Sequence, residues 1–269
     1  MKIKNILAAI AVTAWSGMAC AGFVTTFGQT KSLNGNWPLT TYAEAANART
    51  AFVTALGAGA TASFYDFEGA TAGATDPLTI ALGGVSATLS GAGQVNNTPS
   101  GTDFGRFSVS GNSGSTSQGT QYWATSASNE PTSFLLDFNG AAVQGFGFFA
   151  TDVGDFDGSL SLRLTLMDGT FLDVSPGDPF PDGEVFGSGP ILGPDADGSV
   201  LFFGVRALSN QYFKAVRFIS VGGSTPDEFG FDMFTVVAAP GGPLPTPLPG
   251  SLALVGAALG GLALVRRRR

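Results

Sequence analysis

Histidine is absent from the 269 residues of this chain, and Cys20 is its only cysteine. Without histidine there can be no Ser-His-Asp triad, no imidazole base and no imidazole metal ligand. Zinc and copper sites are therefore not expected, because both metals depend heavily on His and Cys ligands. Gly-x-Ser-x-Gly, Gly-x-Gly-x-x-Gly and P-loop motifs are also missing, which removes the usual sequence signatures of hydrolase and nucleotide sites.

The first 21 residues have the layout of a secretory signal peptide. Lys2 and Lys4 precede an apolar stretch over residues 6–15, and Ala19-Cys20-Ala21 is an A-x-A-like cleavage site. Cleavage after Ala21 would remove the only cysteine and leave a mature chain without disulfide or thiol chemistry. The alternative is a lipoprotein that keeps Cys20 as its lipidated residue, although residues 17–19 lack the leucine usual before such a cysteine.

The C-terminal end combines a Pro-x-Pro motif, an uncharged apolar run over residues 248–265 and a basic cluster. As a helix, the apolar run would be roughly 27 Å long, close to the ~30 Å of a bilayer core. A basic end is retained on the cytoplasmic side, which favours a membrane span over a buried core helix. The motif consists of Pro247, Leu248 and Pro249, and the basic cluster of Arg266, Arg267, Arg268 and Arg269.

This order of motif, apolar run and arginines resembles the PEP-CTERM sorting signal, with Pro-Leu-Pro in place of the usual Pro-Glu-Pro. The resemblance implies processing by an exosortase-type enzyme and export in a bacterium that makes exopolysaccharide. Residues 64–69 and 229–232 are also similar to segments of the cargo domains that precede such tails. The alternative is a plain single-span anchor that is never processed.

The body between the two terminal signals is strongly acidic. The signals contain six of the thirteen Lys and Arg residues and no Asp or Glu, so seven basic residues face twenty acidic ones, a formal charge near −13. This charge opposes nucleic acid and anionic lipid as partners. It suits divalent cations, or simply solubility outside the cell.

Period-two alternation predicts an all-β body, an antiparallel two-sheet sandwich of jelly-roll type over residues 61–238. The clearest strand covers residues 160–166, with four leucines inward and Ser161, Arg163 and Thr165 outward. Asp168-Gly169 then predicts a hairpin. Further strands are expected at residues 62–68, 85–90, 105–110, 121–125, 133–138, 143–151, 170–174, 200–207, 213–221 and 229–237.

Residues 22–60 are expected to form a separate N-terminal segment, irregular over residues 22–38 and helical after it. Thr41 and Glu44 have the spacing of a capping box, and the helix is expected to stop near Gly57. Residues 239–249 form a proline-rich linker, and residues 250–269 form the sorting signal with its transmembrane helix.

Carboxylates near the two ends of the sandwich form a candidate calcium site, Asp66, Glu68 and Asp232. They are placed similarly to the acids that hold structural calcium in jelly-roll carbohydrate-binding modules. The alternative is that they are hydrogen-bonded turn or edge residues. A weaker candidate is Asp152, Asp155 and Asp157, for which an acidic turn is the simpler interpretation. Asp195 and Asp197 are weaker again.

Tyr122 and Trp123 are candidate sugar contacts, with core packing as the alternative interpretation. We expect a non-enzymatic cell-surface or matrix protein that associates with exopolysaccharide and stays at the cell envelope or outside it. The polysaccharide partner follows from the family resemblance alone. The alternatives are a secreted glycoside-hydrolysing enzyme that uses paired carboxylates, and an unprocessed anchored surface protein.

Overall fold

The computed structural model describes most of the body of the chain. The described residues are 22–30, 39, 41–57, 59–97, 105–109, 119–127, 131–153, 159–174, 198–208, 211–221 and 227–240. The predicted signal peptide and sorting signal lie outside them.

Thirteen strands and one helix follow one another along the described residues. The helix, α1 (Ala43–Ala55), lies between the first two strands. The strands are β1 (Phe23–Thr30), β2 (Ala62–Tyr65), β3 (Leu78–Leu82), β4 (Val85–Gly91), β5 (Gln94–Asn97), β6 (Gln121–Ala127), β7 (Thr132–Asp137), β8 (Val143–Thr151), β9 (Ser159–Leu166), β10 (Phe171–Val174), β11 (Val200–Ala207), β12 (Phe213–Val221) and β13 (Asp227–Ala238). The predicted all-β class with one short N-terminal helix is confirmed.

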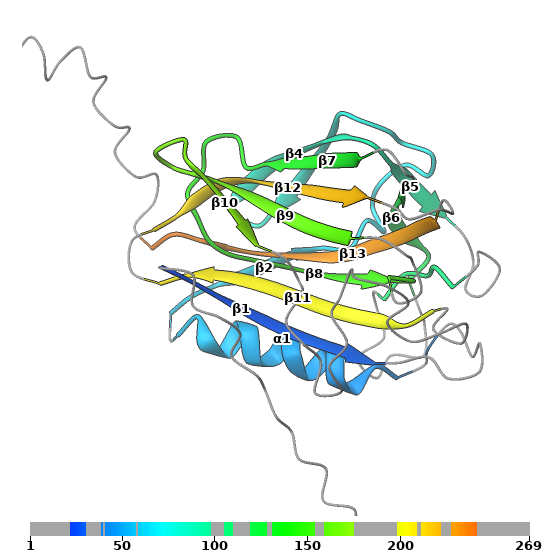
Figure 1. Cartoon of the computed structure of the whole chain (residues 1–269), viewed down its shortest axis with the longest axis horizontal. Helices are drawn as coiled ribbons and strands as arrows, with labels where there is room; N and C mark the ends of the chain where they lie inside the picture. The colour runs from blue at the N-terminus through cyan, green and yellow to red at the C-terminus, as the bar shows by residue number, and fades with distance from the viewer. Residues whose placement is uncertain are drawn as a thin grey trace, which may run out of the picture.

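The strands form two packed antiparallel layers, as Figure 1 shows. In the first, called the β12 sheet, the strand order is β3-β4-β7-β12-β9-β10. In the second, called the β8 sheet, the order is β5-β6-β13-β8-β11-β1, and β2 lies beside the second half of β13. Among the described residues, the pair Phe213 and Val143 connects β12 to β8, so the layers meet there.

Phenylalanine rings fill much of the space between the sheets. Phe134 of β7 stacks on Phe218 of β12 with 4.2 Å between ring centroids, and Phe218 meets Phe148 of β8 edge-on at 5.0 Å. Burying one such side chain contributes about 1.5–3 kcal/mol relative to leaving it exposed. Of the leucines predicted to point inward from β9, Leu160, Leu162 and Leu164 are buried here and Leu166 is half-buried against the same core, so the alternation is confirmed.

Helix α1 covers the outer side of the β8 sheet against β1 and β11 (Figure 1). Its fully buried Phe52 rests on Gly204 of β11, where a Cβ would lie 2.6 Å from the ring. At Gly28 of β1 a Cβ would lie 2.6 Å from the Cβ of Ala48. The bare backbone of these glycines lets the helix approach the sheet closely. In the described part of the chain, no helix is both long and apolar enough to cross a membrane.

The N-terminal segment differs from its prediction. Residues 22–38 were expected to be irregular, but residues 23–30 form β1, which pairs along its whole length with β11, so this part belongs to the sandwich; residues 31–38 lie outside the described residues. The predicted capping box at Thr41 is wrong, because the N-cap is Tyr42 and it makes no side-chain cap. Instead the Thr30 hydroxyl, at the end of β1, accepts from the backbone N–H groups of Glu44 and Ala45 at 3.2 and 3.3 Å. A strand residue therefore caps the helix.

Two further strand predictions need correction, and two strands were missed. Residues 105–110 were predicted to form a strand, but residues 105–109 are irregular. Phe107 and Val109 pack in the apolar cluster that α1 forms with the β8 sheet. The strand predicted over residues 62–68 ends at Tyr65, because Phe67 has φ 61° and turns the chain. The short strands β3 and β5 were not predicted.

Candidate functional site on the open face of the β12 sheet

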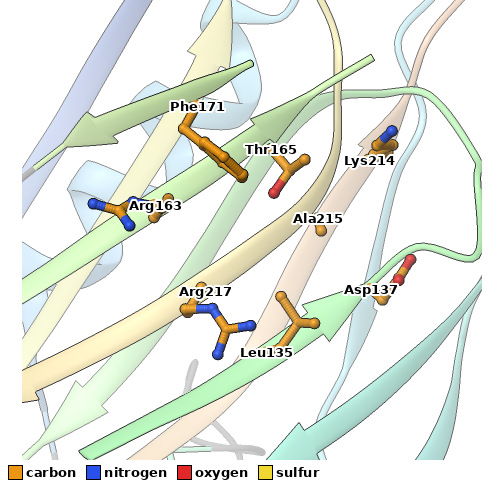
Figure 2. A pocket seen from close by; sticks show the side chains of 8 residues that line it. All are labelled: Leu135, Asp137, Arg163, Thr165, Phe171, Lys214, Ala215 and Arg217. Atoms are coloured by element: carbon orange, nitrogen blue, oxygen red, sulfur yellow. The ribbon is translucent and has the colours of Figure 1, made fainter. Parts of the chain in front are cut away.

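Two rows of outward-facing side chains cross the middle of the β12 sheet, as Figure 2 shows. Successive side chains of a strand alternate between faces, and the neighbours of these residues point into the core. The rows therefore face away from the β8 sheet, on the side opposite to α1 (Figure 1). From β7 to β10, the first row is Leu135, Arg217, Arg163 and Asp173, and the second row is Asp137, Ala215, Thr165 and Phe171. Below, this surface is called the open face.

A shallow hollow of about 270 Å³ lies on the open face. It exists because Ala215 has only a methyl group, while Asp137 and Thr165 on either side of it are longer. Its volume falls just below the roughly 300–1,000 Å³ of enclosed small-molecule pockets. The hollow suits surface contact with a few groups of an extended ligand. The residues that line it are Leu135, Asp137, Arg163, Thr165, Phe171, Lys214, Ala215 and Arg217.

Phe171 stands at one end of the hollow with 65% of its surface exposed. In the described residues only Phe64, at 54%, is another large hydrophobic side chain that is exposed. The Arg163 guanidinium lies 5.8 Å from the Phe171 ring centroid, a cation–π distance. Arg163 is itself held by Asp173, through Nε to Oδ1 at 2.7 Å and Nη2 to Oδ2 at 2.8 Å. An exposed aromatic ring is thus supported from one side by a fixed ion pair.

On the open face, one arginine is paired with a carboxylate, while two other cations form no salt bridge within the described part of the chain. The hydrogen bonds between Arg163 and Asp173 raise the pKa of the arginine and lower the pKa of the aspartate, so both stay charged. Arg217 contacts the Ser133 hydroxyl at 3.3 Å, and in the described residues neither it nor Lys214 forms a salt bridge with a carboxylate. Lys214 does lie near Asp168, whose carboxyl pKa is lowered by hydrogen bonds from Thr170 and, to a smaller extent, by the charge of Lys214. Of the seven Lys and Arg residues between residues 22 and 240, three line this hollow. An acidic protein therefore presents a local group of cations here.

The predicted sugar contacts lie elsewhere, and the structure corrects them. Tyr122 and Trp123 are adjacent in β6, so their side chains point to opposite faces of the β8 sheet. Both are fully buried, and Trp123 stacks in the core against Phe67 with 6.4 Å between ring centroids. Neither ring can stack on a sugar from solvent in this arrangement.

Two of the three predicted calcium ligands come together, but through hydrogen bonds. Ser108 Oγ lies 2.7 Å from Asp232 Oδ2 and 3.3 Å from Glu68 Oε1. Asp232 also accepts from the N–H groups of Val109 and Met233 at 2.8 and 2.6 Å. Glu68 accepts from the N–H groups of Thr120 and Gln121 at 2.8 and 2.9 Å.

Asp66 stays apart and accepts from the N–H of Glu68 at 3.2 Å, as in an Asx turn. Within the part of the chain that the structure describes, no three acidic side chains are grouped to hold a metal. The contacts of Glu68 and Asp232 fit the hydrogen-bonding interpretation. Calcium at this place stays a prediction.

The weaker calcium candidate is only partly visible. Asp155 and Asp157 lie outside the described residues, as do Asp195 and Asp197. Asp152 is 3% exposed, has φ 63° and accepts from the N–H of Gly198 at 3.1 Å. Its carboxylate thus ties the end of β8 to the chain that enters β11.

Comparison with known proteins does not place the chain in a family. No protein-family model and no curated protein matches it. The K2 cleaved adhesin domain of Lys-gingipain aligns at 17% identity and a TM-score of 0.35, over 67% of this chain and 98% of that one. TmCBM61, solved in complex with β-1,4-galactotriose, aligns at 16% identity and a TM-score of 0.30, over 57% of this chain and 88% of that one.

A third solved structure, CpGH89CBM32-5 from Clostridium perfringens in complex with GalNAc-β-1,3-galactose, aligns at 12% identity and a TM-score of 0.25. It covers 54% of this chain and 93% of that one. At such TM-scores these similarities carry no argument about what this chain binds. Any functional inference must therefore rest on the geometry of the open face.

Proposed function

We propose that this protein is an exported, non-enzymatic module that binds polysaccharide on the open face of the β12 sheet. The observation that carries the proposal is the exposed, supported ring of Phe171 at the edge of a hollow lined by hydrogen-bonding side chains. Ligand sites combine apolar or aromatic surface with a few polar groups that fix orientation, and Phe171 beside this hollow has that combination. Its flat apolar face suits the apolar face of a sugar ring, and Thr165 and Asp137 can bond to sugar hydroxyls.

The rival proposal is a glycoside-hydrolysing enzyme that acts at the same hollow. Glycoside hydrolysis ordinarily needs two carboxyl groups that flank the scissile bond. Asp137 is the only carboxylate among the residues that line the hollow. Asp173, the other carboxylate of the two rows, lies on β10 with β12 and β9 between it and Asp137, and it is already engaged by Arg163. These facts favour binding over hydrolysis.

Substitution of Phe171 tests the binding proposal, and the chain offers a matched control. Phe64 is also exposed and also has an arginine over its ring, with Arg49 at 5.6 Å, but it belongs to β2 in the β8 sheet. We expect Phe171→Ala to weaken polysaccharide binding by about 2 kcal/mol, roughly 30-fold in Kd, as for a central aromatic contact. Phe64→Ala should bind as the wild type does.

The measurement is affinity electrophoresis of the full-length protein through gels that contain the exopolysaccharide of its host or a panel of purified polysaccharides. Equal retardation of the wild type and Phe171→Ala would rule out the open face as the binding surface. Release of reducing sugar from the same panel, abolished by Asp137→Asn, would favour the enzyme.

For localisation, we propose that the C-terminal signal directs the chain to an exosortase-type enzyme and that the domain remains at the cell envelope or outside it. The proposal rests on the Pro247-Leu248-Pro249 motif, the apolar run and the terminal arginines. Intact-mass measurement of the mature protein tests it. A mass that lacks the tail supports processing, whereas a chain that still ends at Arg269 supports the simple anchor.

A further inference from the structure

We propose that the open face selects polysaccharides whose sugars carry carboxylate groups, and that Arg217 pairs with that carboxylate. The inference deepens the proposed function and rests on it, because it names the chemical class of the ligand at the same surface. It depends on the register of β12 with β9, on the partners of each cation and on the position of the hollow.

The strand register places two arginines directly opposite each other. Arg217 of β12 faces Arg163 of β9, and Asp173 of β10 follows on the far side of Arg163. Like charges in directly opposed positions of a sheet are unfavourable. The single carboxylate of this row binds Arg163, so it compensates only one of the two arginines. Arg217 is exposed and bonds to one neutral hydroxyl.

The Arg163–Asp173 pair shows what the second arginine lacks. The guanidinium of Arg163 meets the two carboxylate oxygens of Asp173 through two separate N–H groups, at 2.7 and 2.8 Å. This two-pronged contact matches a planar carboxylate better than a single point charge would. A carboxylate of the ligand would do for Arg217 what Asp173 does for Arg163. Lys214, which also lines the hollow and forms no salt bridge in the described residues, would add a second cation beside it, partly offset by the nearby Asp168.

The remaining residues of the hollow fit the rest of an acidic sugar. Phe171 offers its exposed ring to one face of the sugar, and the small Ala215 leaves room between the ring and Asp137. Asp137 lies at the opposite end of its row from Phe171, where it can accept bonds from sugar hydroxyls. The body elsewhere is strongly acidic and repels a polyanion, so contact would be confined to this face.

The probe for this proposal is polygalacturonate, and its highly methyl-esterified form is the matched neutral probe. Binding of the full-length protein to each is measured by titration in EDTA, so that calcium cannot cross-link the polymer. Arg217→Gln removes the proposed partner. Arg206→Gln, in β11 of the β8 sheet, changes the net charge equally and is the control.

We expect the wild type to bind polygalacturonate and to bind the esterified form at least about tenfold more weakly. Arg217→Gln should lose about tenfold in affinity for polygalacturonate, whereas Arg206→Gln should lose less than about twofold. Raising NaCl from about 0.05 to about 0.3 M should weaken binding of polygalacturonate alone, since salt screens exposed charges.

Other outcomes would overturn the inference in distinguishable ways. Equal binding of both polymers, with both lost in Phe171→Ala, would leave the proposed function in place and remove the selection for carboxylate. Equal losses in Arg217→Gln and Arg206→Gln would reduce the effect to overall charge. Binding of dextran sulfate without binding of polygalacturonate would refute the proposed selection for carboxylate groups. Failure to bind any polysaccharide, neutral or acidic, would end both proposals.

Discussion

Asp232 gives the sharpest stability prediction, because its carboxylate is 1% exposed and holds residues 105–109 onto the β8 sheet. Its oxygens accept from Val109 N–H at 2.8 Å, Met233 N–H at 2.6 Å and Ser108 Oγ at 2.7 Å. In Asp232→Ala the serine hydroxyl can turn to Glu68, but the buried N–H of Val109 and the partly buried N–H of Met233 lose their acceptor. Each unsatisfied group costs about 1–3 kcal/mol, so the free energy of unfolding should fall by about 4 kcal/mol.

Asp232→Asn separates the hydrogen bonds from the volume of the side chain. The amide keeps one oxygen and so strands one N–H group in place of two, at about 2 kcal/mol. For a domain of this size, the Tm should fall by roughly 4–8 °C in Asp232→Asn and by roughly 8–16 °C in Asp232→Ala. Asp173→Ala, a carboxylate 57% exposed in a surface ion pair, is the control and should change stability by less than about 1 kcal/mol.

The assay is thermal and urea unfolding of the full-length protein, with calcium and with EDTA. If Asp232 stabilises the fold through its hydrogen bonds alone, each variant loses the same free energy of unfolding with calcium and with EDTA. If Asp232 also binds calcium, EDTA lowers the Tm of the wild type and has no effect on Asp232→Ala. A change below about 1 kcal/mol for Asp232→Ala in EDTA would refute the hydrogen-bond reasoning.

Two further predictions concern the smaller apolar cluster between α1 and the β8 sheet, which includes Tyr42 and Phe52. Burial, with a smaller contribution from Asp232, raises the pKa of Tyr42 to about 12 from 10.0, so the neutral phenol is the form that the fold stabilises. The stabilisation that comes from the neutral phenol is complete below pH 10.0 and is lost as pH rises through about 12. Tyr42→Phe loses the 2.7 Å hydrogen bond to the Val109 carbonyl, so its free energy of unfolding at pH 7 should be about 1 kcal/mol lower. In urea melts at alkaline pH, its free energy of unfolding should fall less steeply with pH than that of the wild type. Parallel pH profiles would contradict this. Gly204→Ala should cost about 1–3 kcal/mol, because its Cβ would lie 2.6 Å from the buried Phe52 ring, whereas Gly84→Ala, with nothing within 4 Å, should be nearly neutral in the same melts.

Much of the sandwich could be predicted from sequence because its central strands have clear local patterns. β9 alternates leucine with polar residues, and β8 and β11 are apolar on both faces because one side meets the other sheet and the other side meets α1. β1 has no such pattern. Its pairing with β11 joins parts of the chain that are far apart, and its end residue Thr30 caps a helix, which no local signal of the helix itself reveals.

The open face was only partly predictable, because it too depends on pairing between strands that are far apart in the sequence. Alternation correctly placed Arg163 and Thr165 outward, and the hairpin at Asp168-Gly169 would have put Phe171 beside them. No local pattern brings Arg217 opposite Arg163, because that depends on the register of β12 with β9. Tyr122 and Trp123 misled because burial of β6 on both faces is a tertiary property. Of the three acids predicted to form a calcium site, the structure brings Glu68 and Asp232 together. Both bond to Ser108, a residue that no local pattern in the sequence points to.

The location of the bound polysaccharide is best measured by covalent footprinting. The full-length protein is labelled with a carbene reagent, with and without the polysaccharide that it binds, and peptide masses report where labelling falls. A ligand on the open face should protect residues 133–137, 161–165, 171–173 and 214–217 and leave α1 and β1 unchanged. Protection of α1 or β1, with the β12 sheet labelled as in the free protein, would contradict the proposed binding surface.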